Sequence, residues 1–278
     1  MERRMRRVGR VMAVLCMFGA IGATSCAQAD SEASRQILSG AGDSRLIIIG
    51  EMHGTREIPA LVGELANRYS QQGPLLLGIE ISRGEHDSLR DYLSSPIPAP
   101  SYLAARPAWQ KPRTANDGRR SKAMLALIEV MRRLRAQGRD VAVLPFDVSR
   151  SGNGAEARDH AMADYLRAAY QALPNGRLLV LAGNVHAMQE KPTYCPQCQS
   201  PMTSYLRDLA PFSVSVVAER GASWGCTARC GPVPVASTHL RGGPTAGGRD
   251  DVYSFVTVLP AFTPAELIEA PLAPEGVW

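Results

Sequence analysis

Short apolar runs alternate with amphipathic stretches along most of the chain. Such runs predict buried strands. They span residues 45–50, 75–81, 141–146, 177–182, 212–218 and 252–259. Between the first four runs, apolar residues recur at helical spacing, which predicts helices at residues 57–70, 85–93, 120–136 and 155–172. This alternation predicts an α/β fold, a single domain with a mostly parallel central sheet flanked by helices.

Two stretches show neither an apolar run nor the helical spacing of apolar residues. Residues 94–113 contain five prolines, and residues 221–250 are rich in glycine and proline. Both residue types interrupt helices and strands. We therefore expect a loop or lid at residues 94–113 and an irregular segment at residues 221–250.

The N-terminus has the pattern of a secretory signal peptide. Five arginines in the first ten residues precede an apolar stretch at residues 11–23, which is too short to span a membrane. Cleavage after Ala29 leaves a mature domain of residues 30–278. The alternative is lipidation of Cys26, for which Ala23 is a poor match to the usual large aliphatic residue. The sequence favours a signal peptide at residues 1–29 and an exported, periplasmic or secreted protein, attached to a membrane only if Cys26 is lipidated.

The charge balance changes once that segment is set aside. The whole chain has a formal net charge of +5, but residues 1–29 hold five arginines and one glutamate. Without them, 26 basic and 25 acidic residues remain, a net charge of +1. This balance does not favour nucleic acid as a partner. We expect a small molecule or peptide as substrate, or haem as ligand.

Cysteines occur in two close pairs after the predicted signal peptide. Cys195 and Cys198 form a C-x-x-C motif, and Cys226 and Cys230 are separated by three residues. In an exported chain, an even number of cysteines favours disulfides, and four cysteines allow three pairings. A structural zinc site is the competing interpretation, since the spacing also suits zinc ligands, and redox chemistry of the thiols is a third.

One motif, G-x-x-H, occurs twice. It follows the first predicted strand and ends at His53, and it follows the fourth and ends at His186. Open α/β sheets bind ligands beyond the carboxyl ends of their strands. Imidazole is both a common general base and a common metal ligand. We therefore place both histidines in the functional site.

Carboxylates accompany these histidines. Glu51 lies inside the first motif, and Glu80 ends an otherwise apolar strand, where an unpaired charge is costly. A metal, a cationic neighbour or a raised pKa would account for Glu80. Glu51, His53, Glu80 and His186 form the predicted catalytic set. His53, Glu80 and His186 are the predicted ligands of a divalent metal.

Further polar residues lie near the same predicted edge of the sheet. Asp147 ends the third strand and Asn184 lies beside His186. Arg119 opens the predicted helix at residues 120–136, and Arg158 lies on the next helix. We expect these four as substrate contacts. Arg120, beside Arg119, is the alternative contact for an anionic group of the substrate. The remaining candidates have structural or surface roles as their first interpretation: Glu57, His86, His160 and His239.

The paired motifs, with Glu80 on a strand between them, resemble the superfamily of TIKI proteins, TraB proteins, erythromycin esterases and ChaN-type haem-binding lipoproteins. The resemblance covers roughly residues 45–220, and in size and export the chain is most similar to the ChaN branch. It implies that Glu51, His53, Glu80 and His186 correspond to the family's site. Its members differ in activity: metal-dependent proteolysis, hydrolysis of a macrolide lactone, or haem binding.

A metal-dependent hydrolase of unknown substrate is the function that the sequence favours. Haem binding for iron uptake is the alternative, with His53 or His186 as the ligand, although an aromatic content of 6% suits a haem pocket poorly. Two histidines and one carboxylate also match the ligands of a non-haem iron oxidant.

Overall fold

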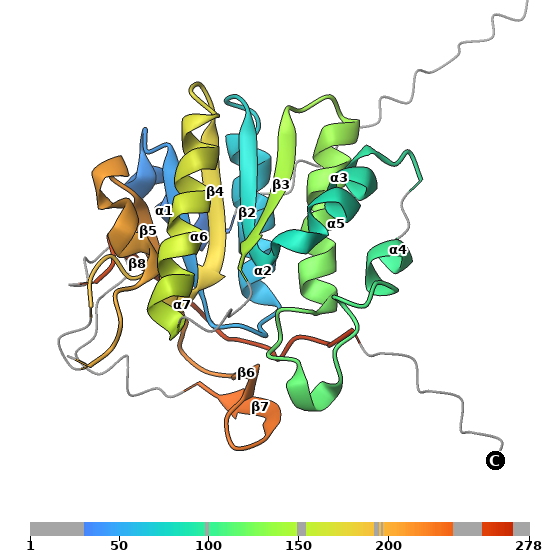
Figure 1. Ribbon diagram of the computed structural model, residues 1–278, viewed down its shortest axis with the longest axis vertical. Helices are drawn as coiled ribbons and strands as arrows, with labels where there is room; N and C mark the ends of the chain where they lie inside the picture. Colours follow the sequence, from blue (N-terminus) through green and yellow to red (C-terminus); the bar gives the residue numbers. More distant parts are fainter. Residues whose placement is uncertain are drawn as a thin grey trace, which may run out of the picture.

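A parallel sheet lies at the centre of the protein (Figure 1). The computed structural model describes residues 31–97, 100–148, 154–191, 195, 197–235 and 252–268. Within these ranges the sheet has six strands in the order β3-β2-β4-β1-β5-β8. In chain order they are β1 (Leu46–Glu51), β2 (Leu75–Ser82), β3 (Val141–Asp147), β4 (Arg177–Gly183), β5 (Phe212–Ala218) and β8 (Phe255–Leu259). Neighbouring strands of this sheet all pair in parallel.

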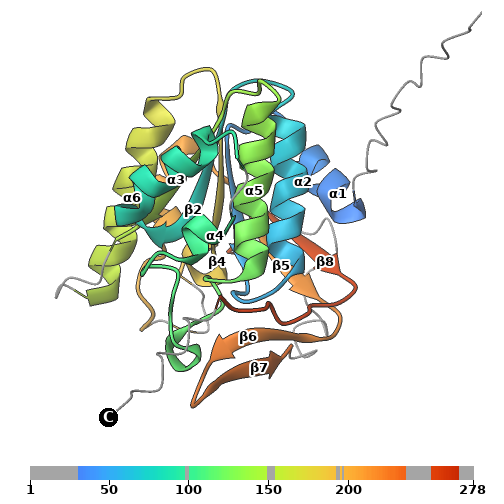
Figure 2. The ribbon, with the colours of Figure 1, turned by 90° about the vertical axis from the view of Figure 1, so that its right-hand side faces the viewer.

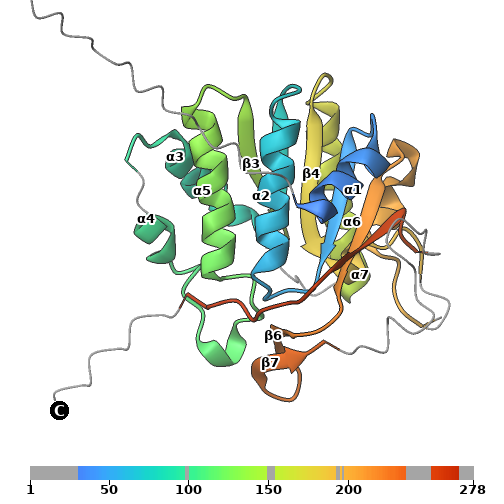
Figure 3. The same ribbon diagram turned by 180° about the vertical axis from the view of Figure 1, so that it is seen from behind.

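Helices cover both faces of the sheet. One face carries α1 (Glu32–Ala41), α2 (Glu57–Tyr69) and α5 (Lys122–Ala136), which Figure 3 shows in front of the strands. The helix α3 (His86–Ser94) packs against α5 and against β3 at the edge of the sheet. The other face carries α6 (Gly154–Gln171) and the 3-10 helix η3 (Met202–Leu209). Figure 2 shows α6 and α5 on opposite sides of the sheet.

The strands read as continuous apolar runs because both of their faces are buried. In β1, Ile47 and Ile49 pack with the helices of the first face, while Leu46 and Ile48 pack with those of the second. Each of these four side chains is at most 1% exposed. The predicted fold class, a mostly parallel sheet flanked by helices, is confirmed.

Two predictions about irregular segments are wrong in part. Residues 94–113 include the short helix α4 (Pro100–Ala104), and the 3-10 helix η2 (Arg113–Ala115) begins at their end. Residues 221–250 begin with an antiparallel hairpin, β6 (Ala222–Cys226) and β7 (Cys230–Pro234). The hairpin lies below the sheet in Figure 1, on the side of the carboxyl ends of the strands. Contacts with segments distant in the sequence stabilise the hairpin, and the local spacing of apolar residues does not predict such contacts.

Several short elements were not predicted. They are α1, the 3-10 helices η1 (Arg83–Glu85) and η3, and the single-turn helix α7 (Asn184–Ala187). The last strand is also shorter than expected, since β8 begins at Phe255 and not at residue 252. The long helix α5 begins at Lys122, so Arg119 and Arg120 lie in the loop before it. There Ser121 caps the helix by accepting a hydrogen bond from Met124 N.

Both cysteine pairs are disulfides. Cys195 is bonded to Cys198, and Cys226 is bonded to Cys230 across the hairpin. This selects one of the three pairings that the sequence left open, and it does not support the zinc interpretation. Disulfides persist in oxidising compartments, so these bonds are compatible with an exported protein.

Some sequence predictions lie outside the described residues: the signal peptide at residues 1–29, Cys26 and His239. Among the helices that the structure describes, none is long and apolar enough to cross a membrane.

Truncation of a central core residue tests this architecture. We expect Ile48→Ala to lower the free energy of unfolding by about 2–5 kcal/mol, because Ile48 is fully buried and the change leaves a cavity. Urea denaturation of the disulfide-bonded protein measures the effect. Ile97, at 70% exposure, supplies the matched control. Equal losses for Ile48→Ala and Ile97→Ala would contradict the described packing.

Candidate functional site

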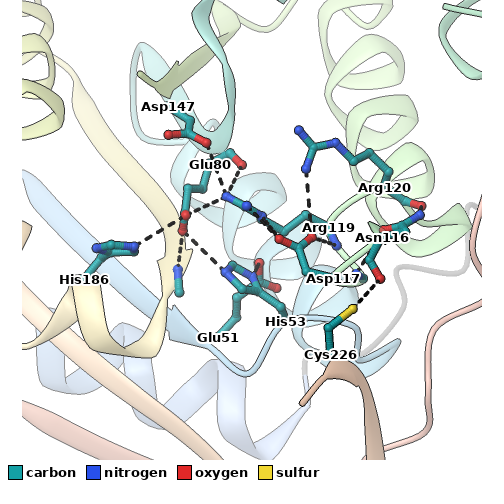
Figure 4. Close-up of polar contacts among 12 residues, drawn as sticks. Glu51, His53, Glu80, Asn116, Asp117, Arg119, Arg120, Asp147, His186 and Cys226 are labelled. Atoms are coloured by element: carbon teal, nitrogen blue, oxygen red, sulfur yellow. Dashed lines mark hydrogen bonds and ion pairs between the residues drawn. The ribbon is translucent and has the colours of Figure 1, made fainter. Parts of the chain in front are cut away.

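The two G-x-x-H motifs lie side by side because their strands are neighbours. β1 pairs with β4 in parallel, with Gly50 opposite Ala182 and Glu51 opposite Gly183. Both motifs therefore leave the sheet at the same edge, where this class of sheet binds ligands. The structure brings His53 and His186 to opposite sides of Glu80, which lies near the end of the next strand, β2 (Figure 4).

The glycine of each motif makes room for the other motif. A Cβ on Gly183 would lie 2.8 Å from His53 Nε2 and 3.3 Å from Glu80 Oε2. A Cβ on Gly50 would lie 3.0 Å from the Cβ of Ala187 in the short helix that carries His186. Close approach of a side chain or backbone is a recurrent reason for glycine. The two motifs are thus packed into one unit.

His53 is paired with Glu51. Its Nδ1 lies 2.8 Å from Glu51 Oε1, and its Nε2 lies 3.6 Å from Glu80 Oε2. Glu51 is buried, whereas the His53 side chain keeps 24% of its surface exposed. A carboxylate on Nδ1 favours the tautomer with the proton on Nδ1, which leaves Nε2 free to accept a proton.

The environment raises the pKa of His53. Burial alone would lower it, but the negative charges of Glu51 and Glu80, and the hydrogen bond to Glu51, outweigh burial and the opposing charge of Arg119. The imidazole of His53 therefore binds a proton more readily than a histidine in water does.

Glu80 is the most heavily paired carboxylate of the site. Its Oε1 accepts hydrogen bonds from Arg119 Nη1 at 2.7 Å and Arg158 Nη2 at 2.8 Å, and its Oε2 accepts one from Gly183 N at 2.7 Å. Burial alone would raise its pKa, but the charges of His53 and Arg119 and the Gly183 N–H hold the pKa of Glu80 well below its usual range. Glu80 is therefore an anion, and the cationic neighbours that the sequence called for are arginines.

Asp147 connects the two arginines. Its Oδ1 accepts from Arg158 Nε at 2.9 Å, and its Oδ2 lies 3.3 Å from Arg119 Nη1. Arg119 also donates through Nε and Nη2 to Asp117 Oδ2. The guanidinium groups that we expected as substrate contacts thus face carboxylates of the protein itself.

His186 has a different environment from His53. Its Nδ1 lies 2.6 Å from Asp159 Oδ1, and its Nε2 lies 2.9 Å from Arg158 Nη1. With the proton on Nδ1, Nε2 accepts the arginine N–H. His186 therefore holds Arg158 against Glu80, and its Nε2 lone pair is occupied.

Asp159 and Asp117 were not among the predicted residues. Asp159 is buried, and its Oδ1 also accepts a hydrogen bond from Met202 N at 2.7 Å. It lies on α6 directly after Arg158, and no apolar strand precedes it, so the strand-end rule could not find it. Asp117 belongs to the loop before α5, whose position only the tertiary structure reveals.

The remaining candidates lie at the margin of the site or away from it. Asn184 accepts a hydrogen bond from Val185 N, and its carbonyl accepts one from Tyr253 Oη. Glu57 accepts a hydrogen bond from Thr263 N, so it contacts the C-terminal segment. Arg120 Nε donates to Ala108 O. His86 and His160 are exposed helix residues, with side chains 49% and 57% exposed.

The residues present do not fit a divalent metal. Among the described residues no group of three or more His, Cys, Asp or Glu side chains is placed to hold one ion. The predicted ligand atoms are also occupied by donors, since Arg119 and Arg158 lie within 3 Å of Glu80 Oε1 and Arg158 lies 2.9 Å from His186 Nε2. A metal ion placed between two guanidinium groups would be repelled. We therefore derive no chemistry from a metal.

Two surface grooves lie away from this network. One, of about 620 Å³, runs between α2 and α5 and is lined in part by Gly63 and Ala126. The other, of about 720 Å³, lies between α4, the hairpin and the C-terminal segment, and is lined in part by Trp224 and Pro264. Neither lining includes the histidines of the paired motifs, so the chemistry remains at the edge of the sheet.

The glycine of the second motif can be tested directly. We expect Gly183→Ala to displace the imidazole of His53, since the added Cβ would lie 2.8 Å from Nε2. The ¹H–¹⁵N resonances of His53 should therefore shift. Gly138→Ala is a useful comparison, because nothing lies within 4 Å of that position, although its positive φ adds some strain. Unchanged His53 resonances in Gly183→Ala would contradict the close contact.

The pKa of His53 gives a second test. We expect Glu51→Gln to lower it, because the substitution removes a negative charge that favours the imidazolium while keeping a similar shape. An NMR titration of the imidazole measures the change. Glu57→Gln, on a carboxylate that contacts Thr263, should leave the titration unchanged. A His53 pKa that stays put or rises in Glu51→Gln would show that Glu51 does not control it.

Comparison with known proteins establishes the fold. No family model and no curated protein matches the sequence. The chain is similar in structure to a histidine-to-asparagine variant of the erythromycin esterase EreC in its open conformation, with a TM-score of 0.60 and 11% identity over 84% of this chain and 94% of that one. It is also similar to a succinoglycan biosynthesis protein (TM-score 0.59, 11% identity, 83% and 91% covered) and to a Bacillus cereus protein (0.55, 11%, 82% and 91%). The chain thus shares its fold with these three proteins.

Proposed function

We propose that this protein is a hydrolase in which His53 acts as the general base. The observation that carries the proposal is the Glu51–His53 pair at the carboxyl edge of the sheet, with Nδ1 bound to a buried carboxylate and the imidazole side chain partly exposed. The shared fold supports it, because one similar structure is named as an esterase. A small molecule or peptide with an ester, lactone or amide bond is the proposed substrate class.

The chemistry follows from the two nitrogens of His53. Nε2 takes a proton from a water molecule as its oxygen attacks the substrate carbonyl, and the imidazolium then gives this proton to the leaving group. Glu51 fixes the tautomer and stabilises the imidazolium during the reaction. General base catalysis of this kind contributes about 10²–10⁴-fold to a rate.

Charged residues around His53 supply the electrostatic environment. The guanidinium of Arg119, with a side chain 15% exposed, lies against Glu80 next to the base. We propose that it stabilises the negative charge that develops on the carbonyl oxygen of the substrate. His186 is a positioning residue in this scheme, because its Nε2 faces Arg158. Glu80 holds both arginines in place. Export through the signal peptide at residues 1–29 would place this activity in the periplasm or outside the cell.

Activity on a panel of aryl esters and lactones tests the proposal. We expect the purified, oxidised protein to accelerate hydrolysis, and His53→Asn to lower kcat by about 10²-fold or more, since the general base is lost. His160→Asn, on an exposed residue of α6, should keep the activity of the parent protein. A His53→Asn protein as active as the parent would contradict the assignment.

The same preparation separates the other functions that the sequence allowed. Activity that survives dialysis against a chelator supports the metal-free scheme, whereas loss on chelation and recovery with a divalent metal would overturn it. A Soret band that appears on titration with haem and is absent from His53→Ala, without any esterase activity, would favour haem binding instead.

A further inference from the structure

We propose that Trp224, on the hairpin β6–β7, is a positioning residue that sets Arg119 against Glu80. The proposal rests on the function proposed above for its effect on catalysis. Trp224 lies outside the set of residues at the edge of the sheet and has no titratable group. It connects the loop that carries His53 to the loop that carries Arg119.

Trp224 ties the two loops together with hydrogen bonds. Its backbone N donates to Gly54 O at 2.8 Å, directly after His53. Its indole Nε1 donates to Asn116 O at 2.8 Å, three residues before Arg119. The side chain is buried, with the residue 3% exposed. A single residue of the hairpin therefore contacts both sides of the site.

The two loops are also in close contact with each other. A Cβ on Gly118 would lie 2.3 Å from Gly54 Cα, and a Cβ on Gly54 would lie 2.1 Å from Trp224 O. Both glycines have a positive φ, of 96° and 75°. The backbones of Gly118, Gly54 and Trp224 are thus stacked so closely that residues 54 and 118 must be glycine. Movement of Trp224 therefore displaces both loops.

Asn116 closes the turn that presents Arg119. Its Oδ1 accepts a hydrogen bond from Gly118 N at 3.0 Å, and its Nδ2 donates to Arg120 O at 2.9 Å. The carbonyl that accepts from Trp224 belongs to the same residue. Arg119 leaves this closed turn and reaches Glu80 Oε1 at 2.7 Å.

The hairpin is itself held in place against this segment. Its disulfide lies beside the loop, with Cys226 Sγ 3.5 Å from Asn116 O (Figure 4) and Cys230 Sγ 3.1 Å from Thr114 O. The guanidinium of Arg113 stacks 4.1 Å above the ring of Trp224. The disulfide at the turn of the hairpin and the ring of Trp224 are thus both held against residues 113–116.

Trp224→Phe tests the proposal because it keeps an aromatic ring and removes the Nε1 donor. We expect the Arg119 Nε–H resonance, assigned by its loss in Arg119→Gln, to shift and broaden. We expect kcat for ester hydrolysis to fall roughly tenfold with little change in KM, since misplaced groups lower catalysis more than binding. Trp109→Phe is the matched control: Trp109 is fully buried, its Nε1 has no hydrogen-bond partner among the described residues, and both readouts should stay unchanged.

A double variant distinguishes positioning from general loss of structure. If Trp224 acts through Arg119, Trp224→Phe should not lower kcat further in an Arg119→Gln background. Independent losses that multiply would overturn the proposal, and so would an unmoved Arg119 resonance in Trp224→Phe. A shifted resonance in a protein without esterase activity would support the positioning role while contradicting the proposed function.

Discussion

The negative charge of Glu80 inside the sheet is the constraint on which the site depends. An isolated carboxylate at 3% exposure would cost several kcal/mol. Arg119, Arg158 and the Gly183 N–H compensate it at 2.7–2.8 Å. Each arginine then needs its own counter-charges, which are Asp117 and Asp147 for Arg119 and Asp147 for Arg158. His186 contacts Arg158 and extends the network to Asp159. The site is therefore a network of charged side chains centred on a single buried anion.

The strands that bring this network together could be predicted from the sequence, but their order in the sheet could not. The apolar runs could be recognised as strands because both faces of a parallel sheet are buried, and their ends located His53, Glu80 and Asp147 at one edge. The order of the strands could not be read in the same way. The pairing of β1 with β4, which packs Gly183 against His53, depends on crossover connections that leave no local pattern.

Other features were out of reach of periodicity for stated physical reasons. Asp159 lies on α6, where an acidic residue next to an arginine is also typical of an exposed face. The hairpin β6–β7 has the glycine and proline content of a loop, so its composition did not predict strands. A disulfide and the contacts of Trp224 stabilise it, and these leave no alternating apolar pattern in the sequence. The arginines were expected to bind substrate, since a sequence shows a cation without showing the carboxylates it faces.

The network also determines which residues can report on function. Removal of one member of a buried ion pair leaves its partner charged and unpaired, which costs about 3–5 kcal/mol and lowers stability and activity together. Single substitutions at Glu80, Arg119 or Arg158 would therefore be hard to interpret by themselves, which is why Arg119→Gln serves only to assign a resonance and as the background for Trp224→Phe. His53 and Trp224 differ, because one has an exposed edge and the other is uncharged. The function of this protein is thus best tested at the border of the network, with His53→Asn, which keeps an amide donor for Glu51, and with Trp224→Phe, which changes no charge.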